Sequence, residues 1–523
     1  MLFISILILI MVMAISSLKE KIHPIIFQRM SSIILIYAGA LSLNALYIQS
    51  IGSGIGIYSG LFHVTFISQL IEIFIYIIGA VILIARPLPV NNISTIVPAW
   101  PSASGGQENN YKNTIEYSLL IIFSTLGASL LISSSNLMSM YLSTELQSFA
   151  VYIIATLYKD SELATNAGLK YFLLGSLASC FILLGSGLIY TFSGLTNLES
   201  IYNFISVTEP LNSNISQGIA LGFIIIFVGY LLKVSAAPLH NWAPDVYDES
   251  PTIVTIWLSI MPKISILFLI LEIFTQITSV NPVLESLGLN TIKLLLLISS
   301  LFSLIIGTVV GLTQIKIKRL LAYSTISHIG FILLALAINS VQSIDSFIFY
   351  ILQYTLTNLN TFLILIAIGY ILNNNILINK GSEKDINYIS ELKGLFFSNP
   401  ILSISLTICL LSMAGTPPFL GFFSKQFVLY SAIESGYYFM SIAGILVSII
   451  SASYYLRIIR ILHTEGPLVL NKSINGPENS KVEISNIHSL IISILTLLIL
   501  FFIFKPSILL KSTQLLSLSI FSN

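Results

Sequence analysis

One stretch of the sequence places charged groups where a membrane protein normally excludes them. The run from Gly229 to Leu271 holds two lysines, Lys233 and Lys263, inside segments otherwise apolar enough to span a bilayer. An ammonium at that depth is costly unless it pairs, loses its proton or meets water. Pro238 falls five residues after Lys233 and removes a backbone donor, so the carbonyl of Val234 loses its helical partner. The run therefore predicts a helix that breaks beside a buried base, which is typical of an ion path.

The composition indicates an all-α polytopic membrane protein, because 55% of the 523 residues are hydrophobic and only 9% are charged. The two cysteines, Cys180 and Cys409, each lie in an apolar run and are too few for a metal or iron–sulfur site. The sequence shows no phosphate loop or dinucleotide fingerprint, and a net charge of +1 does not indicate nucleic acid. We therefore expect this chain to bind no cofactor, metal or nucleic acid. The apolar N-terminus lacks the basic region of a signal peptide and predicts a retained first helix.

Apolar runs of suitable length predict about fourteen transmembrane helices. They lie at residues 2–17, 31–51, 62–86, 117–134, 137–158, 164–191, 217–239, 251–276, 292–311, 319–339, 346–371, 401–430, 437–461 and 486–504. Of the 23 lysines and arginines, 16 fall in loops after odd-numbered helices, two in the C-terminal tail and five within spans. Because basic loops gather on one side of a membrane, this distribution supports the count and places both termini on the opposite side.

A second irregularity resembles the first. The span at 401–430 carries Pro417 and Pro418 at its middle and Lys425 beyond them, so the carbonyls of Met413 and Ala414 also lose their partners. Helices 4–8 and 9–13 then form two sets of five, each with its fourth member broken by proline. Since five is odd, the second set runs inverted relative to the first. The predicted regions are residues 1–116 with three accessory helices, a first repeat at 117–276, a second repeat at 292–461, and residues 462–523 with the last span and tail.

Three more candidates for this path are polar residues inside predicted spans. Glu145 is about eight residues into its helix, roughly 12 Å deep, which favours ion pairing or proton handling. Lys170 lies about a turn and a half from a span end, so it either snorkels to the surface or belongs to the same path. His328 is either a packed histidine or a relay group, since imidazole exchanges protons near neutral pH.

Six stretches carry a family resemblance. STELQSFAVYIIA, AGLKYFLLGS, LLKVSAAPLHNWAPDVYDESPT, IMPKIS, RLLAYSTISHIGF and GTPPFLGFFSKQFVL occur in this order and resemble motifs of the antiporter-like membrane subunits of respiratory complex I, the NADH:ubiquinone oxidoreductase. The resemblance covers predicted helices 4–13 and implies two inverted five-helix bundles, each with a half-channel, joined by a polar axis. A sister subunit has glutamate at the position of Lys425, so the lysine favours the branch of subunit 2. A long loop at 87–116 and a polar linker at 372–399 depart from the pattern.

The resemblance also implies roles for this chain and its surroundings. Carried over by motif, the proton relay consists of Glu145, Lys170, Lys233, Lys263, His328 and Lys425. Glu145 is implied to pair with Lys233, and its movement would switch the lysine between charged and neutral forms. The chain is thus expected to be a non-redox subunit of an enzyme whose NADH, FMN, iron–sulfur clusters and ubiquinone bind to other subunits. Its expected partners are other membrane-arm subunits, including sister antiporter-like subunits, and lipids.

Two alternatives compete with a proton-translocating subunit of complex I. A structural scaffold is disfavoured because packing alone does not offset the burial of lysines. In an Mrp-type cation/proton antiporter, sodium would need several oxygen ligands, whereas the axis offers four lysines and a histidine against one glutamate. Protons are therefore favoured. An uncleaved chain rich in Ile, Leu and Asn predicts a multi-pass protein of the mitochondrial inner membrane, with basic loops in the matrix; a bacterial plasma membrane is the alternative.

Overall fold

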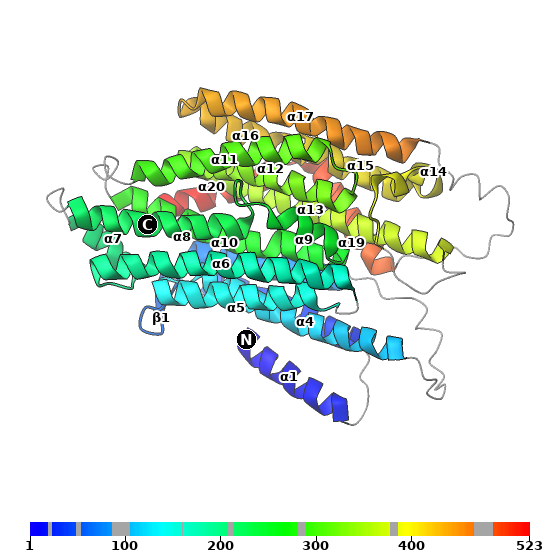
Figure 1. The fold of residues 1–523 in the computed structure, drawn as a ribbon, viewed down its shortest axis with the longest axis horizontal. Coiled ribbons are helices and arrows are strands. Elements are labelled where there is room, and N and C mark those ends of the chain that lie inside the picture. Colours follow the sequence, from blue (N-terminus) through cyan, green and yellow to red (C-terminus); the bar gives the residue numbers. More distant parts are fainter. Residues whose placement is uncertain are drawn as a thin grey trace.

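The computed structural model describes residues 1–18, 24–48, 54–85, 105–158, 161–207, 213–280, 289–376, 385–464 and 485–522. Most helices lie side by side with their long axes roughly aligned, and the chain proceeds across the bundle from α1 at one edge to α17 at the other (Figure 1). The predicted loop at 87–116 lies outside the described residues up to residue 104, as do residues 377–384 of the polar linker.

In the first half of the bundle, the residues that the structure describes form ten helices. They are α1 (Leu2–Leu18), α2 (Pro24–Ile48), α3 (Phe66–Ile84), α4 (Gly105–Ile132), α5 (Leu137–Thr156), α6 (Glu162–Ser193), α7 (Leu198–Val207), α8 (Ser213–Val234), α9 (Trp242–Glu249) and α10 (Thr252–Val280).

The second half continues with α11 (Leu289–Leu312), α12 (Ile317–Ile338), α13 (Val341–Ile376), η4 (Ile389–Leu392), α14 (Leu395–Ser398), α15 (Pro400–Ala414), α16 (Leu420–Glu434), α17 (Tyr438–His463), α19 (Asn486–Phe501), η5 (Phe502–Phe504) and α20 (Ser507–Ser522). In the described residues, ten helices are long and apolar enough to cross a membrane, and three shorter apolar ones accompany them. The helical polytopic fold is therefore confirmed, whereas the number fourteen stays a prediction.

Several elements differ from the sequence prediction. Residues 62–64, assigned there to a helix, form β2 (Phe62–Val64), which pairs antiparallel with β1 (Ile55–Ile57). The reversal between the strands places Tyr58, Ser59 and Gly60 at positive φ, a conformation that apolar periodicity does not report. The short helices α7 and α9 and the terminal helix α20 were not predicted, because the search was for runs of spanning length.

Two helices end within the bundle. α8 stops at Val234, Ser235 has a φ of 67°, and α9 begins only at Trp242, after Pro238. The indole of Trp242 donates to the carbonyl of Leu232 at 2.8 Å and so joins the two sides of this break. Indole hydrogen bonding therefore satisfies one of the carbonyls at the end of α8.

The second interruption lies between α15 and α16. α15 stops at Ala414, Gly415 follows with a φ of 85°, and α16 begins at Leu420, beyond Pro417 and Pro418. A glycine is suited to this left-handed position, and the prolines supply no backbone donors to continue the helix. Both interruptions leave backbone carbonyls available to side chains.

Matching close approaches occur in the two halves. A Cβ added to Gly127 of α4 would lie 2.6 Å from the backbone nitrogen of Gln147 in α5, and one added to Gly307 of α11 would lie 2.7 Å from that of Ser327 in α12. Glycine therefore permits a helix contact that any side chain would block. Each contact joins residues 20 positions apart, so α4–α5 and α11–α12 pack in a related way.

The starts of α5 and α12 are held by the same kind of backbone link. An isolated antiparallel bridge joins Asn136, before α5, to Asn197, before α7. Another joins Lys316, before α12, to Tyr388, before η4. Thus α5 and α12 each begin against a segment that leads into a short helix.

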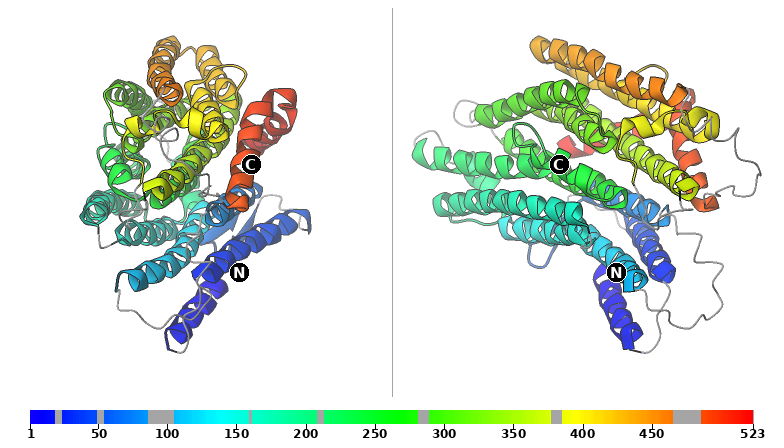
Figure 2. Two further views of the ribbon diagram at one scale, coloured as in Figure 1. Left: turned by 90° about the vertical axis from the view of Figure 1, so that its right-hand side faces the viewer. Right: turned by 45° about the vertical axis from the view of Figure 1, so that its right-hand side comes forward.

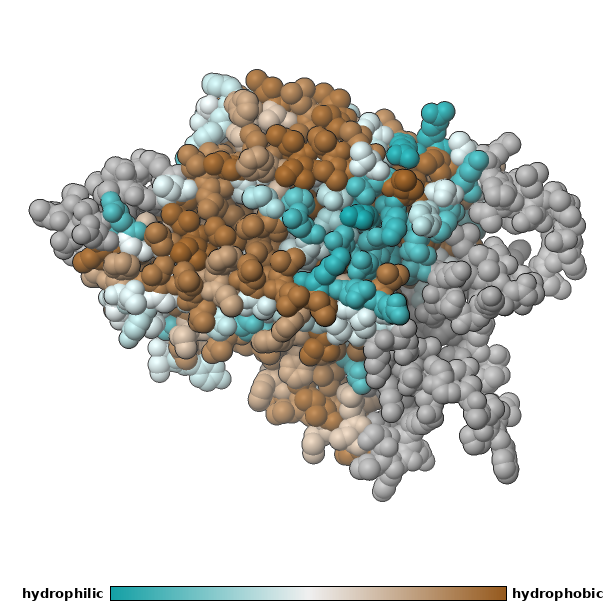
Figure 3. Space-filling view, viewed as in Figure 1, coloured by the Kyte–Doolittle hydropathy of each residue, from teal (hydrophilic) through white to brown (hydrophobic). Residues whose placement is uncertain are grey.

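The outer surface is largely apolar. Hydrophobic residues dominate the face seen in Figure 3, and a hydrophilic area interrupts them where Figure 1 places α9. The C-terminal helices α19 and α20 pack beside α13 and α3, as the end-on view in Figure 2 shows. The chain is therefore a membrane protein whose lipid-compatible exterior encloses a largely hydrophobic core that contains buried polar side chains.

Candidate functional site

The first buried pair joins α5 to α8. Lys233, in the last turn of α8, lies with its Nζ 3.3 Å from Oε1 of Glu145, and the two side chains are 7% and 14% exposed. Lys233 lies next to Val234, the last residue of α8, so the pair is directly beside the interruption around Pro238. A carboxylate at this distance stabilises the ammonium in a low-dielectric interior.

Lys263 is held by hydroxyl groups. The residue is 1% exposed in α10, and its Nζ donates to the hydroxyls of Thr325 at 3.3 Å and Tyr354 at 3.5 Å. It also lies 5.4 Å from the ring centroid of Tyr247. No ion pair with a carboxylate is found for Lys263 among the described residues. Neutral partners stabilise a charged amine less than a carboxylate does, so this position suits a base that changes charge.

His328 lies between tyrosines. One ring nitrogen shares a hydrogen bond with the Tyr350 hydroxyl at 2.8 Å, and the other lies 3.4 Å from the Tyr455 hydroxyl. Its ring is also 6.1 Å from that of Tyr354, which contacts Lys263. Two tyrosines one turn apart on α13 therefore connect the surroundings of Lys263 and His328.

Lys425 uses the second interruption directly. Its Nζ donates to the carbonyls of Met413 and Ala414, each at 2.9 Å, and the residue is 7% exposed. These are the two carbonyls that the prolines were expected to release. The Nζ also lies 5.7 Å from the ring centroid of Phe331, which stacks on Tyr350. Phe331 therefore lies between Lys425 and Tyr350, the tyrosine that shares a hydrogen bond with His328.

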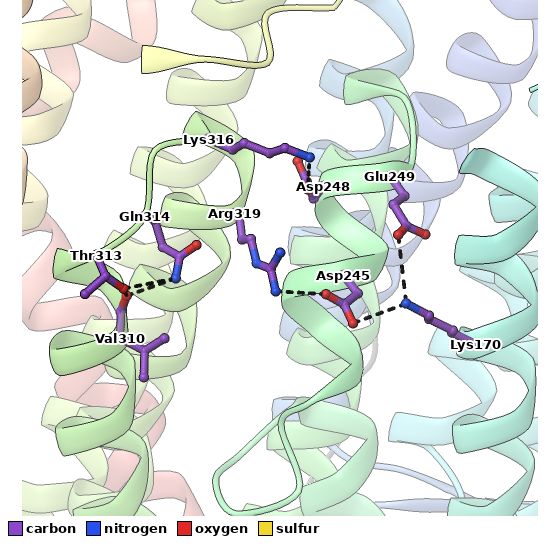
Figure 4. A network of polar contacts seen from close by, with 9 residues as sticks. All are labelled: Lys170, Asp245, Asp248, Glu249, Val310, Thr313, Gln314, Lys316 and Arg319. Carbon is purple, nitrogen blue, oxygen red and sulfur yellow. Dashed lines mark hydrogen bonds and ion pairs between the residues drawn. The ribbon is translucent and has the colours of Figure 1, made fainter. Parts of the chain in front are cut away.

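Lys170 lies apart from these residues. Its side chain is 46% exposed and its Nζ lies 3.3 Å from Asp245 and 3.8 Å from Glu249, both on α9 (Figure 4). Asp245 also pairs with Arg319 at 3.2 Å. The structure thus brings Lys170 to a charged surface between α6, α9 and α12, and not to the Glu145 pair.

A partly buried ion pair lies next to this charged surface. Lys318, counted as a loop residue in the sequence, lies in the first turn of α12, is 2% exposed, and donates to Asp385 at 2.6 Å and to the carbonyl of Ser250 at 3.0 Å. Asp385 also accepts from the backbone and hydroxyl of Thr252, at the start of α10. Asp385 of the linker therefore binds to both α10 and α12.

The hydroxyl partners of Lys263 and His328 were not predicted from the sequence. Tyr350 and Tyr354 are four residues apart on α13, and Asn358 continues the series, so a polar stripe at helical spacing in an apolar span was available as a signal. Thr325 and His328 are three apart on α12 and share a face in the same way. In the described residues, no group of three or more His, Cys, Asp or Glu is placed to hold a metal.

Comparison with known proteins identifies the family. A family model described as NADH:quinone oxidoreductase/Mrp antiporter, transmembrane, matches residues 134–451. The chain belongs to this family. It is 48% identical to NADH-ubiquinone oxidoreductase chain 2 of Rhizopus oryzae, over 98% of this chain and 99% of that protein. It is also 35% identical to NADH-quinone oxidoreductase subunit N of Paramagnetospirillum magneticum, over 76% of each chain. The family resemblance seen in the six motifs is thereby confirmed.

Two solved structures share the fold. A chain of respiratory complex I from Thermus thermophilus matches with a TM-score of 0.70 and 23% identity, over 98% of this chain and 99% of that one. A chain of the Mrp complex from Dietzia sp. matches with a TM-score of 0.75 and 16% identity, over 99% and 96%. The fold is common to both kinds of assembly, so it does not separate them.

Proposed function

We propose that this chain is a proton-translocating membrane subunit of an NADH:ubiquinone oxidoreductase and performs no redox chemistry itself. The observation that carries the proposal is the set of titratable side chains inside the bundle: Lys233, Lys263, His328 and Lys425, with Glu145 as the carboxylate of the first pair. A helical scaffold would be more stable with apolar residues at these places. The extensive identity to a chain 2 relative supports the same assembly.

The mechanism follows from the partners of each group. Movement of Glu145 away from Lys233 removes the nearby negative charge, so the lysine releases its proton; return of Glu145 favours reprotonation. Lys263 then takes up a proton and passes it to His328 through the hydroxyl of Tyr354 and the neighbouring hydroxyls. Lys425 changes charge at the second interruption, where two backbone carbonyls accept hydrogen bonds from its ammonium group.

The two-repeat organisation is part of this proposal. Residues 117–276 and 292–461 are inferred to be inverted repeats with their proline-broken helices at corresponding places. The glycine contacts at Gly127 and Gly307, and the backbone bridges before α5 and α12, support that correspondence. On this plan Lys170 serves the end of the first bundle, where it pairs with Asp245.

The energy for transport is inferred to come from quinone reduction in other subunits, which also hold the NADH, FMN and iron–sulfur groups. The partners are then other membrane-arm subunits, including sister antiporter-like subunits, and lipids. The Mrp-type antiporter is the second candidate, and the shared fold alone favours neither. In the part of the chain that the structure describes, Glu145 is the one carboxylate paired with a buried lysine of the axis, which supports protons over sodium.

One purification separates the two candidates. Affinity capture of this chain from detergent-solubilised membranes should bring flavin and iron–sulfur subunits with it, and the reconstituted complex should acidify or alkalinise vesicles on addition of NADH. Capture without flavin, together with sodium-driven proton exchange that needs no NADH, would contradict the proposal and favour the antiporter.

The location is inferred to be the mitochondrial inner membrane, with the basic loops in the matrix; a bacterial plasma membrane is the alternative. Protease added to intact mitoplasts should leave the linker from Lys380 to Lys393 uncut, and cutting should require disruption of the membrane. Cleavage there from the outer face would contradict this topology.

A further inference from the structure

A small cavity lies beside the first lysine of the relay. It has a volume of about 20 Å³ and lies between α5, α6, α8, α9 and α10; its lining includes Thr144, Gln147, Ser148, Lys233 and Pro262. A space of this size holds about one water molecule, provided that polar groups face it. Thr144, Gln147 and Ser148 supply hydroxyl and amide groups, and Lys233 supplies an amine, so polar groups do face this space.

Gln147 has an unsatisfied end at this cavity. The residue is 3% exposed, its Oε1 accepts from the Ser265 hydroxyl at 3.0 Å, and its Nε2 has no hydrogen-bond partner among the described residues. Leaving a buried amide group unpaired is costly, so an ordered partner is expected. If the amide were turned over, the serine would bond the nitrogen and the oxygen would face the cavity instead. Either orientation leaves one polar atom in need of a ligand.

The position of Gln147 ties the cavity to two lysine-bearing helices. Gln147 follows Glu145 by two residues on α5, and its backbone nitrogen lies at the close contact with Gly127, so the helix has little freedom there. Its side chain reaches Ser265 on α10, two residues after Lys263. The amide is therefore fixed between the Glu145–Lys233 pair and the helix of the next lysine.

We propose that this cavity is a binding site for one water molecule, held between the Gln147 amide and the amine of Lys233. Gln147 is then a positioning residue: it keeps a hydrogen-bond partner at Nζ when Glu145 moves away. The inference rests on the proposed function, because only a lysine that changes partners needs this second one. It adds to that function a residue and a ligand at the first step.

Direct observation of the water is the first test. A high-resolution cryo-electron microscopy map of the assembled complex should show an ordered water within hydrogen-bond distance of both Gln147 and Lys233. A matched map of Gln147→Met, which has a similar length and no amide, should lack it. A well-resolved wild-type map with an empty cavity would overturn the proposal.

Proton transport supplies the second test, with Gln28→Met as the matched control. Gln28 is also a buried glutamine, 7% exposed, but it bonds the carbonyl of Leu83 between α2 and α3. We expect Gln147→Met to slow NADH-driven pumping about tenfold, the factor that corresponds to one hydrogen bond to a charged group. Gln28→Met should pump at the wild-type rate.

The outcomes separate this inference from the function on which it rests. A wild-type complex that does not pump with NADH would contradict the proposed function. If the wild type pumps and assembled Gln147→Met pumps equally fast, the positioning role is wrong while the function stands. If Gln147→Met does not assemble, the wild-type map decides, because the water is either present or absent there.

Discussion

Removal of the charge of Glu145 is the most informative change at the first pair. Glu145→Gln keeps the size of the side chain and an oxygen that can accept from Lys233, but it removes the negative charge 3.3 Å from Nζ. Both side chains are largely buried, so water screens the interaction little. The substitution therefore tests the charge with minimal change in packing.

The expected magnitude follows from the distance. Two unit charges at 3.3 Å interact by about 5 kcal/mol at an effective dielectric constant of roughly 20. Loss of one partner from a buried pair costs about 3–5 kcal/mol, and the retained amide oxygen places this case near the lower end. A loss of about 3 kcal/mol disfavours charged Lys233 by roughly a hundredfold, since 1.4 kcal/mol is tenfold. The charged form of Lys233 would then be populated less at each stage of the cycle, and transfer through it should slow accordingly.

The assay compares proton uptake with NADH oxidation in membrane vesicles. We expect Glu145→Gln to assemble and bind its neighbours, but to pump far fewer protons per electron than the wild type. Glu162→Gln is the control, because Glu162 is an exposed glutamate in the first turn of α6. An assembled Glu145→Gln complex with normal proton yield would show that the charge of Glu145 is not needed for transport and would remove Glu145 from the mechanism.

Two further changes test the packing that positions the site. Asp385→Asn removes the carboxylate partner of buried Lys318; because Asp385 is 36% exposed, we expect a stability loss of about 2 kcal/mol rather than that of a fully buried pair, seen as faster thermal inactivation. An unchanged inactivation temperature would show that the pair contributes no stability. Gly127→Ala places a Cβ 2.6 Å from the backbone of Gln147, so we expect α4 and α5 to separate and assembled complex on native gels to fall sharply. Gly187→Ala is the control, because a Cβ added there would meet no atom of another element within 4 Å, and this variant should assemble normally. Equal assembly of both variants would contradict the close contact at Gly127.

The breaks in the helices could be predicted because proline acts locally. The missing donors of Pro417 and Pro418 identify the carbonyls of Met413 and Ala414, and the structure places Lys425 on both. That lysine lies only 11 or 12 residues from its partners in sequence, so the local chain already carries the signal.

The partners of Lys263 could not be predicted in the same way. Thr325 and Tyr354 are 62 and 91 residues away in sequence, and their approach depends on how α10, α12 and α13 pack. Lys318 was assigned to a loop for a related reason. A lysine near a predicted turn is expected to face solvent, and its burial depends on Asp385, which is 67 residues away in sequence. Single-residue hydropathy carries no information on such pairings.

The proton yield per electron in complexes with Lys263→Met and Lys263→Arg is the most direct test of whether the buried lysines carry protons. Methionine keeps the length without the amine, and arginine keeps a positive charge but does not release its proton. Since Lys263 has hydroxyl partners and no carboxylate within ion-pair distance in the described residues, neither change breaks an ion pair. We expect both complexes to assemble and both to lose most of their proton yield. A full yield with arginine would mean that a fixed positive charge suffices at this position, and it would contradict proton transfer by Lys263.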